Sequence, residues 1–133
     1  MPVRSQLKNE LFMKRKAAFV LVTTTVKNRA EARRLAKTIL NARLAACIQW
    51  TPIHSLYWWK GVVEAANEYL LLAKTRRELA NQLTGLIRSH HSYEVPEITF
   101  VPIEGGLSQY LEWIKTETRP SWRSARKHQS SKP

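Results

Sequence analysis

Apolar and polar residues follow different periods along the chain, and each period predicts a type of secondary structure. Four segments have the continuous or alternating apolar character of strands: 17–22, 45–59, 62–73 and 96–103. Three segments repeat apolar residues at helical spacing: 28–43, 75–89 and 107–117. The resulting order, βαββαβ followed by a helix, predicts an α+β fold. We expect a ferredoxin-like antiparallel sheet with helices on one face, plus a C-terminal helix.

Short polar signals predict where the first two helices begin. Asn28 is followed three residues later by Glu31, and Thr75 is followed at the same spacing by Glu78. In a capping box, the first side chain accepts a backbone hydrogen bond at the start of the helix, and the carboxylate returns to the first residue. Asn28 and Thr75 are therefore expected to be N-caps.

Two features divide the strand-like segments in the middle of the chain. Pro52 interrupts a long apolar and aromatic run. Because proline cannot donate a ladder hydrogen bond, we expect a bend or bulge there. Lys60 and Gly61 separate this run from the next one and predict a hairpin turn.

The chain has more large aromatic residues than are needed to fill a core between two helices and one face of the sheet. The surplus is Trp50, Tyr57, Trp58, Trp59, Tyr69 and Trp113. The other face of the sheet would expose a large apolar patch if it stayed uncovered. A symmetric oligomer covers such a patch and is therefore predicted.

The 133 residues carry 22 Lys and Arg against 10 acidic residues, all of them Glu, for a net charge of +12. A charge of this size first indicates a nucleic-acid or anionic-membrane partner. However, residues 1–16 carry +4 and residues 119–133 carry +5, which leaves only +3 for residues 17–118. We therefore expect one domain over 17–118, between a basic N-terminal extension and a basic C-terminal tail that are both flexible.

Cys47 is the single cysteine, which excludes an intramolecular disulfide and a multi-cysteine zinc site. A reducing, cytoplasmic location is the simplest expectation. No apolar run approaches the roughly 20 residues that cross a bilayer, so no membrane partner is expected.

Several motifs resemble, in the same order, those of one known family. They are Leu44-Ala45-Ala46-Cys47, Ser55-Leu56-Tyr57-Trp58-Trp59-Lys60-Gly61, Glu68-Tyr69-Leu70-Leu71-Leu72-Ala73-Lys74-Thr75, Ser89-His90-His91-Ser92-Tyr93-Glu94-Val95-Pro96-Glu97-Ile98 and Tyr110-Leu111-Glu112-Trp113. Together they resemble the CutA divalent-cation tolerance family over residues 17–118. The resemblance implies a cytoplasmic homotrimer of ferredoxin-like subunits that is linked to copper tolerance, and some members of the family bind Cu(II).

His90 and His91 are the strongest metal-ligand candidates and Cys47 is a weaker one, since imidazole and thiolate bind Cu(II) and other divalent transition metals. Adjacent helical positions lie about 100° apart, so both rings reach one ion only if the helix has ended or a neighbouring subunit completes the site. The alternative is structural: His91 is a helix C-terminal residue tied into the next loop, and Cys47 is an ordinary core thiol.

Two positions depart from the family pattern. Relatives with a first-strand cysteine would have it where this chain has Thr24, and the family's His-Pro-Tyr is His91-Ser92-Tyr93 here. The resemblance implies that the fold tolerates both changes, whereas the missing thiol removes a soft metal ligand.

The sequence has no Asp, no Gly-rich phosphate loop and no HExxH motif, so no enzyme is expected. The predicted function is that of a trimeric, non-enzymatic divalent metal tolerance protein that binds Cu(II) or another divalent transition metal. RNA-recognition domains share the βαββαβ order, but segment 65–72 lacks their basic and aromatic pattern, which argues against nucleic acid. The alternative function is a trimeric scaffold whose basic tails bind an acidic partner or nucleic acid.

Overall fold

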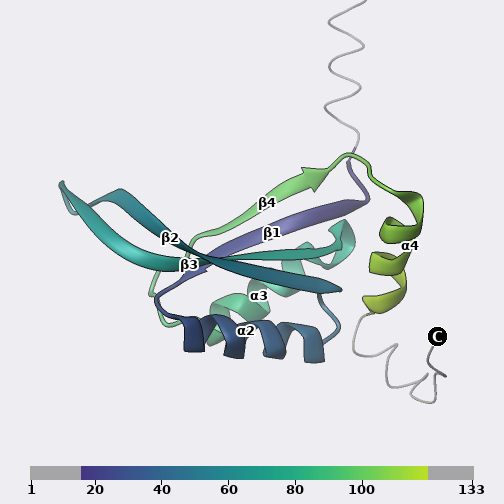
Figure 1. Ribbon diagram of the computed structural model, residues 1–133, viewed down its shortest axis with the longest axis horizontal. Coiled ribbons are helices and arrows are strands. Elements are labelled where there is room, and N and C mark those ends of the chain that lie inside the picture. Colours follow the sequence, from purple (N-terminus) through teal and green to yellow (C-terminus); the bar gives the residue numbers. More distant parts are fainter. Residues whose placement is uncertain (1–15, 120–133) are drawn as a thin grey trace, which may run out of the picture.

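The computed structural model describes residues 16–119 (Figure 1). Its strands are β1 (Phe19–Val26), β2 (Cys47–Trp59), β3 (Val62–Arg76) and β4 (Ile98–Ile103). Its helices are α2 (Arg29–Asn41), the short 3-10 helix η1 (Arg77–Leu79), α3 (Ala80–His90) and α4 (Ser108–Glu117). The segments predicted from the apolar pattern therefore have the expected type and order.

The four strands form one antiparallel sheet in the order β2-β3-β1-β4. Helices α2 and α3 lie together on one side of the sheet, and α4 lies beside one end of it (Figure 1). The predicted α+β combination of an antiparallel sheet with helices is confirmed. Strands β2 and β4 form the two edges, so each has one side without a neighbouring strand in the subunit.

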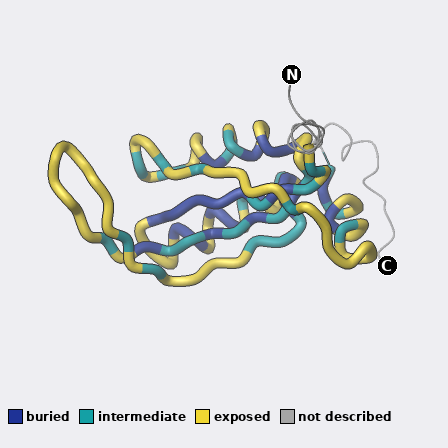
Figure 2. Tube along the Cα trace, turned by 90° about the horizontal axis from the view of Figure 1, so that it is seen from above, coloured by how far each residue is buried: buried dark blue, intermediate teal, exposed yellow. Residues whose placement is uncertain are grey.

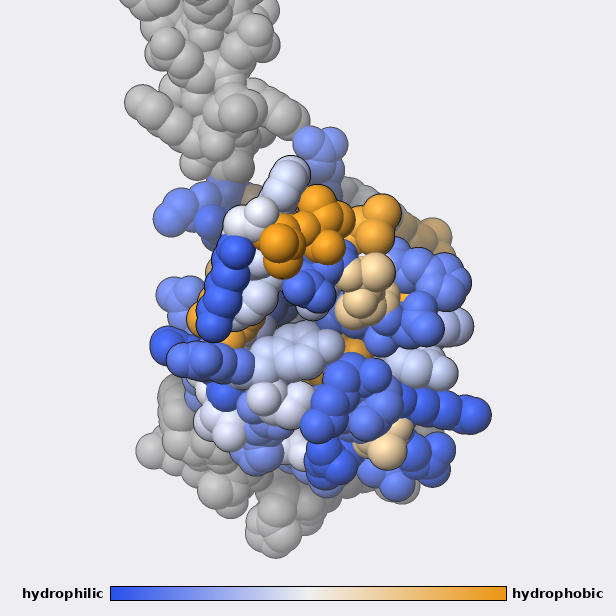
Figure 3. Space-filling view, turned by 90° about the vertical axis from the view of Figure 1, so that its left-hand side faces the viewer, coloured by the Kyte–Doolittle hydropathy of each residue, from blue (hydrophilic) through white to orange (hydrophobic). Residues whose placement is uncertain are grey.

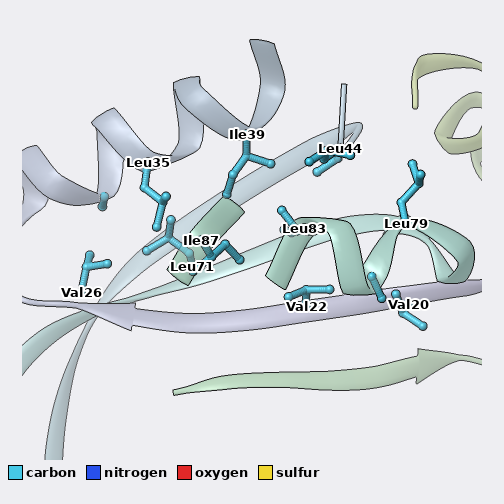
Figure 4. Packing of buried hydrophobic residues seen from close by; sticks show 14 residues of the cluster. Val20, Val22, Val26, Leu35, Ile39, Leu44, Leu71, Leu79, Leu83 and Ile87 are labelled. Atoms are coloured by element: carbon cyan, nitrogen blue, oxygen red, sulfur yellow. The ribbon is translucent and has the colours of Figure 1, made fainter. Parts of the chain in front are cut away.

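The core lies between the sheet and helices α2 and α3 (Figure 4). Alternate residues of a strand point to the same face, and in β1 the core side chains are Val20, Val22 and Val26. The two helices contribute apolar residues spaced by about one turn: Leu35, Ile39, Leu83 and Ile87. Figure 2 shows that burial is concentrated in β1 and in the inner sides of the helices.

Strands β2 and β3 form a hairpin that extends beyond the rest of the sheet (Figures 1 and 2). Their ladder runs without interruption over residues 47–59 and 62–74. Strand β1 pairs with β3 only as far as Tyr69. Residues 53–68, which we call the projecting hairpin, therefore have no third strand beside them.

Lys60 and Gly61 form the turn of this hairpin, as the sequence predicts. Both residues have positive φ angles, 50° for Lys60 and 82° for Gly61. Positive φ at both central residues is typical of a type I′ turn, whose twist matches that of the flanking strands.

Replacing Gly61 by Ala is expected to destabilise the protein by about 1 kcal/mol, because a β-carbon disfavours positive φ. No atom of the described part of the chain lies within 4 Å of the place that this carbon would occupy, so the cost arises in the backbone alone. The matched control is Gly85→Ala in α3, which has equally open surroundings but no positive φ. It is expected to stabilise the protein by about 1 kcal/mol. Urea denaturation measures both changes, and shifts of the same sign would contradict this interpretation.

The predicted N-cap at Thr75 is wrong. Thr75 lies in β3, pairs with Val20 and is fully buried, and α3 begins five residues later without a side-chain cap. Glu78 instead forms a salt bridge with Arg76, with an Nη1–Oε1 distance of 2.6 Å. Thr75 belongs to strand β3 because it pairs with β1. The capping pattern does not take this pairing into account.

The predicted bulge at Pro52 is also wrong. Pro52 pairs with Tyr69 in a ladder whose register is constant on both sides of it. Strand β2 is an edge strand, and an edge tolerates proline because a residue there need not donate to a neighbour on both sides.

The predicted flexible extension and tail lie almost entirely outside the described residues, and the domain bounds 17–118 stay a prediction. Within residues 16–119, no helix has both the length and the apolar character needed to span a membrane.

Candidate functional site

His91, one of the two predicted histidine ligands, is the C-cap residue of α3 and is half-buried. Its Nε2 atom lies 2.8 Å from the carbonyl oxygen of Thr25, and its Nδ1 atom accepts a hydrogen bond from the Tyr93 N–H at 3.0 Å. A neutral imidazole that carries its proton on Nε2 satisfies both contacts. In this arrangement His91 has no free lone pair for a metal ion and is tied into the following loop.

His90 has a different environment because it is exposed at the last position of α3. Its Nδ1 atom lies 3.1 Å from the carbonyl oxygen of Leu86 and 3.0 Å from the Ser89 hydroxyl. If Nδ1 donates to Leu86, the lone pair of the imidazole lies on Nε2. That atom has no hydrogen-bond partner among the described residues, so His90 can present it to an ion.

Cys47, the third predicted ligand, does not join the histidines. It is half-buried at the start of β2 and pairs with Lys74. His91 instead contacts Thr25, which pairs with Leu70. Because the two β3 positions are four residues apart, the sites are separated by about 13 Å along the strand. Among residues 16–119, no three His, Cys, Asp or Glu side chains lie close enough together to hold a metal ion.

Thr24, where some relatives would have a cysteine, points into the core. It is 2% exposed, and its hydroxyl has no hydrogen-bond partner among the described residues. This position therefore does not open onto the surface that carries His90.

A buried carboxylate, Glu31, holds the loop that follows His91. Glu31 is 1% exposed, and its two carboxylate oxygens accept hydrogen bonds from the Ser92 N–H at 3.0 Å and the Ser92 hydroxyl at 2.9 Å. Burial by itself raises the pKa of this carboxyl, but the hydrogen bonds from Ser92 and the Lys27 amide and the nearby His91 ring together lower the pKa below its ordinary value.

The sequence pointed to Glu31 for a different reason, as the returning carboxylate of a capping box. Asn28 is indeed the N-cap of α2, and its side chain accepts a hydrogen bond from the Glu31 N–H at 2.8 Å. The carboxylate bonds to Ser92 instead, 61 residues away along the chain. No local pattern could have indicated this contact.

Tyr93 fixes the same loop to the hairpin. Its hydroxyl donates a hydrogen bond of 2.8 Å to Glu68, whose side chain lies in β3 and is 8% exposed. Burial and this hydrogen bond raise the pKa of the Tyr93 phenol, so it remains a protonated donor. The segment 91–97, which we call the anchored loop, is thus held through Thr25, Glu31 and Glu68.

The anchored loop and the projecting hairpin enclose a pocket of about 780 Å³. Three carboxylates line it: Glu68, Glu94 and Glu97. Three aromatic rings also line it: Tyr57, Trp59 and Tyr93. Local sequence pattern does not show that these residues line a common pocket, since the loop and the hairpin are brought together only by the fold.

Fold and site define a class of protein: small α+β subunits with a four-stranded antiparallel sheet, a long projecting hairpin and an anchored histidine-containing loop. Residues 20–117 match the family described as "CutA1 divalent ion tolerance protein". The chain belongs to this family.

Relatives from plants and an archaeon support the assignment. The rice "Protein CutA 1, chloroplastic" is 45% identical over 103 residues, which are 77% of this chain and 58% of the relative. The Arabidopsis thaliana "Protein CutA, chloroplastic" is 44% identical over 101 residues, 75% of this chain and 56% of the relative. The chain thus spans less than three fifths of these plant proteins. The "Divalent-cation tolerance protein CutA" of Archaeoglobus fulgidus is 44% identical over 84 residues, which are 63% of this chain and 82% of that protein.

Solved structures of relatives have the same fold. The rice CutA1 crystal structure superposes with a TM-score of 0.75 at 43% identity and covers 78% of this chain and 96% of the rice chain. A structure titled as the periplasmic divalent cation tolerance protein CutA from Archaeoglobus fulgidus superposes with a TM-score of 0.74 at 38% identity. It covers 74% of this chain and 97% of the archaeal chain.

The predicted cytoplasmic location is contradicted by these names. Two of the relatives are named chloroplastic and one structure is titled periplasmic. The prediction rested on a single cysteine and on the family resemblance. One cysteine excludes an internal disulfide, but it carries no information about the compartment in which a disulfide-free domain works.

Proposed function

We propose that this chain is the subunit of a non-enzymatic homotrimer that contributes to divalent metal tolerance by binding transition-metal ions such as Cu(II). The observation that carries the proposal is the match of residues 20–117 to the divalent ion tolerance family. The strand order β2-β3-β1-β4 supports a ferredoxin-like topology for each subunit.

The projecting hairpin supports the trimer. Four of its apolar residues are more than half exposed: Leu56, Trp58, Val62 and Val63. In Figure 3, which looks toward the end of the molecule where the hairpin projects, apolar side chains gather between hydrophilic ones. A two-stranded ribbon is marginally stable alone, and exposed apolar patches mark protein interfaces. Packing of three copies around a threefold axis would cover these residues.

His90 supports the metal-binding part of the proposal, because within residues 16–119 only the Nδ1 atom of its exposed imidazole has a hydrogen-bond partner. Transition-metal sites combine several nitrogen, sulfur or oxygen ligands, so one imidazole is not enough. The remaining ligands would come from neighbouring copies of the chain. Bound there, the ion would be withdrawn from solution.

Replacing His90 by Ala is expected to weaken Cu(II) binding by about tenfold or more, because it removes the available imidazole nitrogen. The measurement is titration calorimetry of the chelator-stripped full chain with Cu(II), Zn(II) and Ni(II). His54→Ala is the matched control, since His54 is likewise exposed and its Nδ1 atom is likewise engaged, by Asn67 at 2.7 Å. Equal losses in the two variants would show that any exposed imidazole binds the ion. Unchanged Cu(II) binding in His90→Ala/His91→Ala would remove both histidines as ligands.

A further inference from the structure

The pocket between the anchored loop and the projecting hairpin has a charge opposite to that of the protein. The chain carries 22 basic and 10 acidic residues, yet among residues 16–119 three Glu and no Lys or Arg line the pocket. Glu94 and Glu97 are exposed residues of the anchored loop, and Glu68 is buried in the pocket wall. The pocket therefore favours a cation.

The most buried of these carboxylates is held in place before any ligand arrives. Glu68 is 8% exposed, and one of its oxygens, Oε2, accepts the hydrogen bond from Tyr93. Tyr93 in turn belongs to a loop fixed by Glu31 and Thr25. A charged group fixed by its surroundings loses little conformational freedom when it binds a ligand.

The aromatic residues add a second preference for a cation with an apolar part. Faces of Trp and Tyr rings attract ammonium groups, and Trp does so best. The Trp59 ring already attracts an ammonium group of the chain itself, since Lys60 Nζ lies 5.9 Å from its centre, and a ligand would have to compete with Lys60 at this ring. Leu56 and Val95 add apolar surface to the lining, and the remaining lining residues are polar: Thr25, His54, Ser55 and Ser92.

The size of the pocket indicates an organic molecule rather than a bare metal ion. A volume of about 780 Å³ lies within the range of small-molecule sites, which is about 300–1,000 Å³. A metal ion needs several ligands within about 2.5 Å of one point, and no three acidic, His or Cys side chains of residues 16–119 are so arranged.

We propose that this pocket binds a small organic ammonium compound, with its positive charge among Glu68, Glu94 and Glu97 and its apolar part against Tyr57, Trp59 and Tyr93. This role goes beyond the divalent-cation function and does not depend on it. Because the hairpin also forms the proposed trimer surface, a neighbouring copy would border the open side of the pocket.

The test compares choline with 3,3-dimethylbutan-1-ol, which has the same shape and no charge. Both are titrated into the chelator-stripped full chain and followed by calorimetry or ligand-observed NMR. Choline is expected to bind with a dissociation constant of about 1 mM or tighter. The uncharged analogue is expected to bind at least about tenfold more weakly. Equal affinities, or no binding of choline, would overturn the proposal.

Two double variants test whether choline binds in the pocket. Glu94→Gln/Glu97→Gln is expected to weaken choline binding by about tenfold while leaving the melting temperature unchanged, since both residues are exposed. The control Glu104→Gln/Glu112→Gln removes two charges from exposed positions outside the pocket and is expected to retain the affinity. Equal losses in both double variants would show attraction to the overall charge and would overturn the proposed site.

Discussion

Replacing Glu31 by Gln is expected to destabilise the protein by about 2 kcal/mol, because a neutral amide cannot accept both hydrogen bonds from Ser92 as a carboxylate does. In these part-buried contacts the Ser92 N–H or hydroxyl would then face an N–H donor. Urea denaturation measures the free energy of unfolding. The control Glu104→Gln changes an exposed residue and is expected to stay within about 0.5 kcal/mol of the wild type. Equal stability of the two variants would contradict a structural role for Glu31.

The same carboxylate makes stability depend on pH. Its pKa is lower in the folded protein than the ordinary value of 4.5, so the folded state binds fewer protons around this pH. The stabilisation is therefore present above pH 4.5 and is lost as the pH falls through the lowered pKa. The difference in unfolding free energy between wild type and Glu31→Gln is expected to shrink from about pH 6 to about pH 3. A difference that does not change with pH would show that the charge of Glu31 is not the cause.

The double variant Leu56→Glu/Trp58→Glu is expected to abolish the proposed trimer and leave a monomer. The two residues lie on the same side of β2 and are 77% and 75% exposed in the subunit. Burying two carboxylates without partners at an apolar interface costs more than such a contact supplies. Light scattering should give three times the chain mass of 15.4 kDa for the wild type and one chain mass for the variant.

Leu107→Glu is the matched control for this prediction. Leu107 is also an exposed leucine, 68% accessible, but it lies at the N-cap of α4, outside the projecting hairpin. It is expected to leave the trimer intact. A monomeric wild type, or a trimer that survives Leu56→Glu/Trp58→Glu, would contradict assembly through the hairpin.

The parts of the fold that could be predicted depend on local pattern. The continuous apolar run of β1, the N-cap at Asn28 and the Lys60-Gly61 turn all follow from residues within a few positions of one another. The N-cap prediction at Thr75 failed because Thr75 pairs with Val20 in the sheet instead. This partner lies more than fifty residues earlier in the chain. A capping pattern says nothing about such distant partners.

The candidate site could be predicted only in part, for the same reason. The sequence singled out His90 and His91 as a pair, but only the fold shows that both ring nitrogens of His91 are engaged. In His90 only Nδ1 is engaged among the described residues. The fold also shows that Glu31 bonds to Ser92 across 61 residues. Sequence pattern identifies which side chains have useful chemistry, whereas the contacts that occupy them or leave them available come from tertiary structure.

The two edges of the sheet differ in a way that limits how copies of this chain can add to one another. Strand β2 offers a long edge of 13 residues and β4 an edge of only six, and each strand contains one proline, Pro52 and Pro102. A fibre that grows by continuing the sheet from copy to copy needs two compatible edges on every molecule. The short β4 edge disfavours such growth, so an exposed aromatic hairpin can serve as a contact surface without making the protein prone to form fibrils.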